Sequence, residues 1–185
     1  MRIIGGTARG LHLTPVGTGD PKAHLRPTSD RVREAIFNLL INGGYGNPVT
    51  GAQVLDVFAG TGALGLEALS RGAARAVFLE NGAVGLALLK KNIALMRAED
   101  RCEVMRRDAT KPVLPPAMRF DLVFLDPPYG KGLGEVALAA LAPWLAPEAL
   151  IVWEESAPPP PPPGFDVLDQ RKYGDTVITI LRASA

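Results

Sequence analysis

The stretch Val54-Leu55-Asp56-Val57-Phe58-Ala59-Gly60-Thr61-Gly62-Ala63-Leu64-Gly65 decides the fold. Its first five residues are apolar except for Asp56 and predict a buried strand. The glycines that follow predict a tight turn, and the residues beyond them predict a helix that runs to Arg71. A strand, a glycine turn and a helix in this order are typical of the first unit of an α/β domain, whose turn approaches a ligand closely.

The same alternation of apolar strands and amphipathic helices continues along the chain. Strands are predicted at 54–58, 76–80, 102–107, 120–126 and 149–154, with helices at 84–96 and 133–145. Strands of this kind form a mostly parallel sheet covered on both faces. Segments 165–171 and 176–181 flank Gly174-Asp175 and predict a closing antiparallel hairpin. We therefore expect a doubly wound, Rossmann-like α/β fold with a mostly parallel seven-stranded sheet and a C-terminal antiparallel hairpin.

Residues 1–45 are predicted to form a small extension, and residues 46–185 the main domain. The extension should contain a hairpin across residues 2–13, a basic loop, and a helix that begins after Thr28 or Ser29 as N-cap. One face of that helix is apolar, formed by Val32, Ala35, Ile36, Leu39 and Leu40. We expect this face to pack on the main domain and to leave Arg31 and Arg33 at its flanks.

Composition limits the possible classes of protein. Hydrophobic residues make up 47% of the chain and charged residues 21%, which excludes a disordered protein. No apolar run approaches the ~20 residues of a membrane helix, and no signal peptide is visible, so a cytoplasmic protein without membrane contact is expected. The single cysteine, Cys102, permits no internal disulfide, and without a cluster of Cys or His residues no metal is expected.

Positive charge is concentrated at the N-terminus. Residues 1–33 carry a net charge of +4, against −3 for the rest of the chain. A nucleic acid would find its electrostatic contacts there, although a solvated arm is an equal alternative. The candidate contacts are Arg2, Arg9, Lys22, Arg26, Arg31 and Arg33.

The glycine turn predicts a cofactor that contains adenosine. Gly60 to Gly65 fits G-x-G-x-x-G, and Glu80, about 20 residues further on, can accept hydrogen bonds from ribose hydroxyls. Asp56 favours S-adenosylmethionine over NAD, since a carboxylate suits a cationic methionine moiety and not a pyrophosphate. Asp108 can accept from the adenine amino group, with a helix cap or turn as its alternative. The assigned residues are Asp56, Ala59, Gly60, Thr61, Gly62, Glu80, Asn81, Asp108 and Ala109.

The run Asp126-Pro127-Pro128-Tyr129 predicts the chemistry, because it ends the fourth strand at the sheet edge where such folds bind ligands. An amino group on a nucleic-acid base is a poor nucleophile. Acceptors at the Asp126 carboxylate and the Pro127 carbonyl would hold both of its N–H groups and aim the remaining lone pair at the methyl donor. Pro128 would fix the backbone, and Tyr129 would stack on a base flipped out of its helix. The alternative is a Pro-Pro turn with a core tyrosine.

Together these residues resemble a known family. The stretch from Asp56 to Ala68, the run from Asp126 to Tyr129, Arg26-Pro27-Thr28-Ser29-Asp30-Arg31-Val32-Arg33-Glu34 and Arg2-Ile3-Ile4-Gly5-Gly6 are similar to bacterial 16S ribosomal RNA guanine-N2 methyltransferases of the RsmD type. The resemblance implies a class I methyltransferase domain that uses S-adenosylmethionine, releases S-adenosylhomocysteine and needs no metal. It also implies that the basic N-terminal residues contact 16S ribosomal RNA or a small-subunit assembly intermediate. We expect a monomer, although the sequence itself does not show the oligomeric state.

Three other functions compete with this hypothesis. A DNA adenine-N6 methyltransferase could use the same Asp126 to Tyr129 chemistry, but the N-terminal motifs favour RNA. An NAD-linked oxidoreductase would lack a residue for hydride chemistry near the cleft, because both histidines, His12 and His24, lie in the N-terminal segment. A non-catalytic RNA-binding module would leave the intact run from Asp126 to Tyr129 without a role.

Overall fold

The computed structural model describes residues 1–16, 28–111 and 115–184. Its elements are α1 (Asp30–Asn42), β1 (Gln53–Val57), α2 (Ala63–Ser70), β2 (Arg75–Glu80), α3 (Ala83–Met96), η2 (Glu99–Arg101), β3 (Cys102–Arg106), β4 (Phe120–Leu125), α4 (Leu133–Leu141), η3 (Ala142–Trp144), β5 (Leu145–Glu155), β6 (Phe165–Tyr173) and β7 (Thr176–Ala183).

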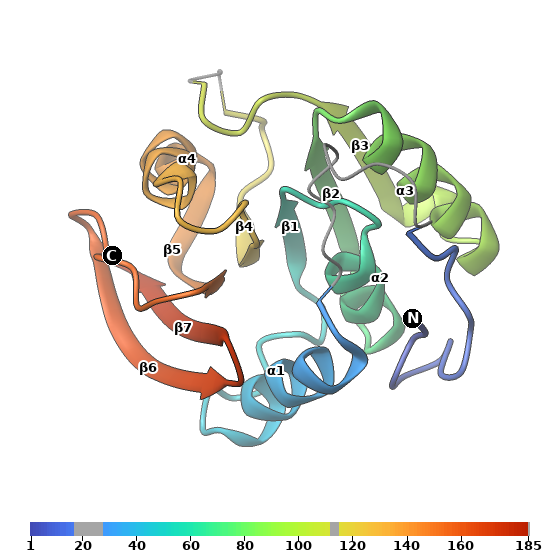
Figure 1. The fold of residues 1–185 in the computed structure, drawn as a ribbon, viewed down its shortest axis with the longest axis horizontal. Helices are drawn as coiled ribbons and strands as arrows, with labels where there is room; N and C mark the ends of the chain where they lie inside the picture. Colours follow the sequence, from blue (N-terminus) through green and yellow to red (C-terminus); the bar gives the residue numbers. More distant parts are fainter. Residues whose placement is uncertain (17–27, 112–114, 185) are drawn as a thin grey trace.

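A single twisted sheet forms the centre of the molecule, as the sequence predicted (Figure 1). The strand order is β3-β2-β1-β4-β5-β7-β6. Strands β1 to β5 are parallel, whereas β7 is antiparallel to both β5 and β6. The order reverses between β1 and β4, and the carboxyl ends of these two strands are where such a sheet binds ligands.

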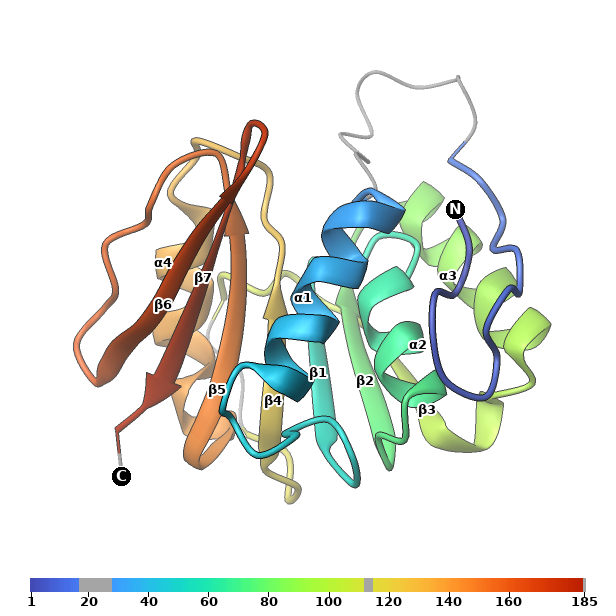
Figure 2. The ribbon, with the colours of Figure 1, turned by 90° about the horizontal axis from the view of Figure 1, so that it is seen from below.

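Helices cover both faces of the sheet. Helices α1, α2 and α3 lie on one face, and α4 lies on the other (Figures 1 and 2). Alternate residues of β1 point to opposite faces, so Val54 joins the first core cluster and Leu55 the second. In α1, Ile36, Phe37 and Leu40 are buried, and each contributes ~1.5–3 kcal/mol of hydrophobic stabilisation.

The N-terminal segment joins the same core as the sheet. The predicted hairpin is reduced to one antiparallel bridge between Arg2 and His12, because amides of the intervening residues bond to Glu67 and Ser70 of α2 instead. Ile3 and Leu13 are buried with residues of α1, α2 and the sheet. Ser29 is the N-cap of α1, since its side chain accepts from the Val32 amide. The extension is thus packed on the main domain, as Figure 2 shows beside α2.

Two element ends differ from the prediction by four residues. Helix α4 stops at Leu141 instead of residue 145, and a 3-10 turn follows. Pro143 explains the early end, because it has no amide hydrogen to donate to the carbonyl four residues earlier. Strand β5 starts at Leu145, four residues earlier than predicted, and a register shift in its pairing with β4 accommodates the extra length.

Candidate active site

The turn after β1 requires glycine. Gly60 and Gly62 have φ angles of 54° and 77°, in the left-handed region that favours glycine. A Cβ added at Gly62 would lie 2.3 Å from Cδ1 of Leu89, so a neighbour would have to move. The Gly62 amide donates to the Ala59 carbonyl at 2.7 Å, which closes the turn directly before α2.

Glu80 joins this turn to the end of β2. Its Oε2 accepts a hydrogen bond from the Gly60 amide at 2.8 Å, and its Oε1 accepts one from the Gly82 amide at 2.6 Å. Each carboxylate oxygen has two lone pairs, so both can still accept from ribose hydroxyls. The position of Glu80 therefore fits the adenosine part of a cofactor.

Asp56 lies beneath the turn, only 1% exposed. Its Oδ2 accepts from the Gly65 amide at 2.9 Å. Burial, aided by the Glu80 carboxylate and opposed by the Gly65 hydrogen bond, raises the pKa of Asp56 to about 8. Asp56 is therefore largely neutral at pH 7, and a cation bound against it would favour its ionised form.

The other residues assigned to the cofactor lie around this turn and after β3. Ala59 and Thr61 are buried in the turn, Ala109 is buried beyond β3, and Asn81 is exposed after β2. The Asp108 Oδ1 accepts from both the backbone amide and the hydroxyl of Thr110, at 3.0 and 2.6 Å, and these bonds lower the pKa of Asp108. Asp108 thus stabilises a turn in this structure, and its contact with adenine stays a prediction.

Asp126 follows β4 directly and lies beside the glycine turn. Its amide donates to the Val57 carbonyl at 3.3 Å, which ties the end of β4 to the end of β1. Its Oδ2 accepts from the Thr28 hydroxyl at 3.3 Å. Burial, followed by the negative charge of Glu154, raises the pKa of Asp126 well above its usual value. The sheet therefore brings the two sequence motifs together.

Tyr129 is half-buried and fixed by its hydroxyl. The hydroxyl donates to Glu154 Oε1 at 2.6 Å and lies 3.1 Å from the Thr176 hydroxyl. Burial and the bond to Glu154 raise the pKa of Tyr129 above its usual range. Pro127 is buried and Pro128 half-buried. The stacking role of Tyr129 and the acceptor role of the Pro127 carbonyl stay predictions.

Sequence reasoning missed Glu154, Thr28 and Thr176 as neighbours of the Asp126 to Tyr129 run. Glu154 is 6% exposed, and its Oε2 accepts from the Thr28 hydroxyl at 2.9 Å. One signal could have identified it. Glu154 is the residue before the last one of β5, and β5 is parallel to β4, which ends just before Asp126, so the two carboxyls lie at the same end of the parallel strands.

Among the predicted RNA contacts that the structure describes, Arg33 is not at the surface. Arg2, Arg9 and Arg31 are exposed. Arg33 is 0% exposed, and its guanidinium pairs with Asp30 at 2.8 Å and Glu67 at 3.5 Å. The prediction that Arg33 contacts RNA is therefore corrected, because its charge is used inside the protein. Lys22 and Arg26 lie outside the described residues.

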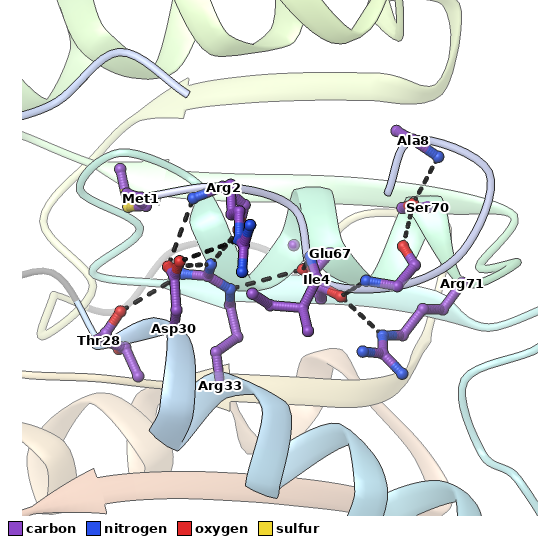
Figure 3. A network of polar contacts seen from close by, with 12 residues as sticks. Met1, Arg2, Ile4, Ala8, Thr28, Asp30, Arg33, Glu67, Ser70 and Arg71 are labelled. Carbon is purple, nitrogen blue, oxygen red and sulfur yellow. Dashed lines mark hydrogen bonds and ion pairs between the residues drawn. The ribbon is translucent and has the colours of Figure 1, made fainter. Parts of the chain in front are cut away.

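A buried carboxylate on α2 binds the N-terminal segment (Figure 3). Glu67 is 0% exposed and accepts from the Ile4 and Gly5 amides, each at 2.8 Å. It also pairs with Arg71 at 2.7 Å. The Arg2-to-Gly6 motif is thus held against the helix that follows the glycine turn, a packing role that the sequence did not indicate.

Within residues 1–16, 28–111 and 115–184, no group of three or more His, Cys, Asp or Glu residues could hold a metal ion. In the same ranges no helix has the length and apolar character needed to cross a bilayer.

Comparison with known proteins places this arrangement in a family. The family model described as Conserved hypothetical protein 95 matches residues 1–182. Ribosomal RNA small subunit methyltransferase D of Escherichia coli strain K12 is 43% identical over 157 residues, which cover 83% of this chain and 74% of the relative. The protein of the same name from Haemophilus influenzae is 40% identical over 159 residues, covering 83% of this chain and 78% of the relative.

A solved structure agrees with these matches. The structure of Escherichia coli yhhF superposes with a TM-score of 0.83 at 37% identity, over 100% of this chain and 98% of that one. The Rossmann-like methyltransferase fold expected from the sequence is thereby confirmed. The chain therefore belongs to the ribosomal RNA small subunit methyltransferase D family.

Proposed function

We propose that this protein transfers a methyl group from S-adenosylmethionine to the exocyclic N2 amino group of a guanine in 16S ribosomal RNA. One observation carries the proposal. The Asp126 amide is bonded to the Val57 carbonyl at 3.3 Å, so the acceptor group of one motif stands beside the glycine turn of the other. A base held at Asp126 would therefore be next to a cofactor held by the turn.

The donor groups of the turn fit S-adenosylmethionine. Glu80 would accept from the ribose hydroxyls, Asp56 would face the cationic methionine moiety, and Asp108 would accept from the adenine amino group. Gly62 would keep the turn in the shape that the cofactor needs, because its positive φ and its close packing against Leu89 leave no room for a Cβ. When bound, S-adenosylmethionine would supply an electrophilic methyl group and keep the C–S electron pair on its sulfur, and the amino group that takes up the methyl would lose one proton.

Asp126 would position the amino group for this transfer. Its carboxylate and the Pro127 carbonyl would accept from the two N–H groups and direct the lone pair toward the methyl donor. The Asp126 carboxylate would also stabilise the positive charge that develops on nitrogen, and would take the departing proton. Tyr129, fixed through its hydroxyl, would present its ring to an unstacked base.

RNA is the favoured substrate because of the N-terminal segment and the relatives. The curated relatives above are named ribosomal RNA small subunit methyltransferases, and their similarity covers 83% of this chain. Exposed Arg2, Arg9 and Arg31 would contact phosphates, with Lys22 and Arg26 as further candidates. We expect a cytoplasmic monomer that acts on 16S ribosomal RNA or on a small-subunit assembly intermediate.

Transfer of tritiated methyl from S-adenosylmethionine tests the proposal. The substrates are small subunits, naked 16S RNA and DNA, all from cells that lack the modification, and the labelled product is digested to nucleosides. N2-methylguanosine from either RNA substrate is expected, and the better substrate shows which assembly state the enzyme uses. N6-methyladenine from DNA would replace the proposal with the DNA alternative, and no transfer to any substrate would favour a non-catalytic RNA-binding module.

A further inference from the structure

A buried amide side chain on α3 joins two other parts of the chain. Asn92 is 0% exposed. Its Oδ1 accepts a hydrogen bond from the Thr14 amide at 2.7 Å, and its Nδ2 donates one to the Thr61 carbonyl at 2.9 Å. Thr14 lies in the N-terminal segment, 78 residues away in sequence, and Thr61 lies in the glycine turn, 31 residues away. Asn92 therefore connects the N-terminal segment to the turn that would hold the cofactor.

The two partners determine which way the amide group of Asn92 points. A backbone amide can only donate and a backbone carbonyl can only accept, so the oxygen faces Thr14 and the nitrogen faces Thr61. An apolar side chain of similar size, such as leucine, could satisfy neither partner. An unpaired polar group is costly beside a side chain as buried as this one. The position therefore requires a side chain that carries both a donor and an acceptor.

The bond to Thr61 fixes one peptide group of the glycine turn. The Thr61 carbonyl and the Gly62 amide belong to the same planar peptide group, so they rotate together. The Gly62 amide donates to the Ala59 carbonyl at 2.7 Å, the bond that closes the turn. A rotation that freed the Thr61 carbonyl from Asn92 would also take the Gly62 amide away from Ala59. The bond from Asn92 therefore keeps the turn closed.

Helix α3 contacts the turn at a second point. Leu89 lies one helical turn before Asn92 and packs against Gly62, where an added Cβ would lie 2.3 Å from its Cδ1. Thr61 is 5% exposed, and its hydroxyl lies 3.7 Å from the Met1 sulfur. On this side the turn lies against α3 and the N-terminal segment and not against solvent.

The N-terminal segment is bonded to the helices on both sides of the turn. On α2, Glu67 and Ser70 accept hydrogen bonds from three amides of the segment. On α3, Asn92 accepts one from Thr14. Figure 2 shows the segment passing beside both helices. The contact on α3 continues into the turn through Asn92, whereas Ser70 is the last residue of α2, at the end away from the turn.

We propose that Asn92 is a positioning residue of the cofactor site, which holds the Thr61–Gly62 peptide group in the closed turn and makes that geometry depend on the N-terminal segment. The proposal rests on the proposed function for the identity of the cofactor, whereas the effect on the turn is a property of the free protein. The N-terminal segment thereby supports cofactor binding besides any contact with RNA. Because such a coupling is reciprocal, a bound cofactor should also hold the segment more firmly.

The first test compares Asn92→Leu with Ser70→Ala in the full-length protein. Asn92→Leu removes both hydrogen bonds with little change in side-chain size. Ser70→Ala loosens the same N-terminal segment away from the turn, because it removes the bonds to the Ala8 amide and the Gly5 carbonyl. We expect calorimetry to show at least about tenfold weaker S-adenosylhomocysteine binding for Asn92→Leu, and wild-type binding for Ser70→Ala. Wild-type affinity in Asn92→Leu, or an equal loss in both variants, would overturn the proposal.

Thr14→Pro tests the same link from the N-terminal segment and leaves Asn92 in place. Proline has no amide hydrogen, so Asn92 loses one partner and keeps its bond to Thr61. Thr14 lies outside the helices and strands, so this variant should fold even if Asn92→Leu does not. We expect the affinity for S-adenosylhomocysteine to fall about threefold, a smaller loss than in Asn92→Leu. An affinity equal to that of Ser70→Ala would contradict the dependence of the turn on the segment.

Hydrogen exchange at the Gly62 amide separates this proposal from the proposed function. NMR measures the exchange in the free protein, and the Leu66 amide, which donates to the Gly62 carbonyl, is the internal reference. Exchange at Gly62 relative to Leu66 should become faster in Asn92→Leu and stay at the wild-type ratio in Ser70→Ala. An unchanged ratio in Asn92→Leu would refute the positioning role. If the wild type does not bind S-adenosylhomocysteine, the proposed function fails, while the exchange ratio still decides whether Asn92 keeps the turn closed.

Discussion

The two sides of the candidate site are held in different ways. On the cofactor side, carboxylates accept hydrogen bonds from backbone amides: Glu80 from Gly60 and Gly82, and Asp56 from Gly65. The partners are at most 20 residues apart in sequence. The geometry of this side is therefore set by the backbone of one strand-turn-helix unit and of the strand end next to it.

On the methyl-transfer side, carboxyls are bonded to side-chain hydroxyls. Thr28 reaches Asp126 across 98 residues and Glu154 across 126, and Tyr129 reaches Glu154 across 25. A network of side chains can change its protonation and bonding without a change of backbone. The difference suggests that the cofactor side is sensitive to backbone conformation and the methyl-transfer side to charge, and the following predictions test this.

Arg33→Ala should have the largest effect on stability. The change leaves Glu67 buried with one cation fewer and removes the donor to the Thr28 carbonyl. Loss of one partner of a buried ion pair costs about 3–5 kcal/mol. Urea unfolding measures this loss of stability, and Arg31→Ala, at an exposed neighbouring position, is the control. Similar unfolding midpoints for the two variants would show that the buried network contributes little to stability.

Gly62→Ala should damage the cofactor side next. The left-handed backbone costs a non-glycine residue about 1–3 kcal/mol, and the new Cβ meets Leu89. Gly51→Ala is a matched control, because Gly51 has a φ of 75° but no atom within 4 Å of an added Cβ. We expect calorimetry to show at least about tenfold weaker S-adenosylhomocysteine binding for Gly62→Ala alone. Equal affinity in both variants would show that the cofactor site does not depend on glycine at position 62.

Cofactor binding should release a proton from Asp56. Its pKa of about 8 leaves it largely neutral at pH 7, and a cationic partner favours the ionised form. The raised pKa of Asp56 also makes the folding stability of the ligand-free protein depend on pH. The contribution of Asp56 to stability is complete below its ordinary pKa of 3.8 and is lost as the pH rises through 8. Calorimetry of cofactor binding in buffers that differ in ionisation enthalpy measures the number of protons released.

Two variants identify the source of that proton. Asp56→Asn should abolish the proton release. Asp126→Asn should preserve it, because the cationic methionine moiety is expected to face Asp56 and not Asp126. Release that persists in Asp56→Asn would mean that another group titrates on binding.

Arg31→Ala should have the smallest effect. Its side chain is exposed on α1 and would neutralise one phosphate, so the slope of log affinity against log salt should fall by about 1 without loss of fold. Filter binding to 16S RNA at several salt concentrations measures this slope. An unchanged slope would place the RNA surface elsewhere on the protein.

Much of the fold follows from local sequence. The period of apolar residues predicts all the strands that the structure contains, and Asp56 to Gly65 predicts the first strand-turn-helix unit. The N-terminal hairpin is shorter than predicted, with only the Arg2 to His12 bridge, because the loop between its arms bonds to Glu67 on α2, which strand propensity does not indicate. Helix α4 ends before its apolar period does, because Pro143 has no amide hydrogen for a further α-helical bond.

The site was less predictable where it depends on distant partners. Glu80 could be found from its spacing to Gly60, whereas nothing local to Glu154 or Thr28 indicates that they meet. Arg33 was misread because its position at the flank of an apolar stripe suggests exposure, and only the tertiary structure brings Glu67 and Asp30 to it. Long-range side-chain pairing is the information that one sequence does not contain.

The most direct test of the account is Asp126→Asn, with transfer to unmodified small-subunit RNA and cofactor affinity measured on the same preparation. Loss of a charge placed for the transition state predicts a fall in kcat of about 100- to 1,000-fold, with the dissociation constant for S-adenosylhomocysteine changed less than a few-fold. A variant that forms N2-methylguanosine at the wild-type rate would contradict the role of Asp126, and with it the central claim that this carboxylate positions the target amino group.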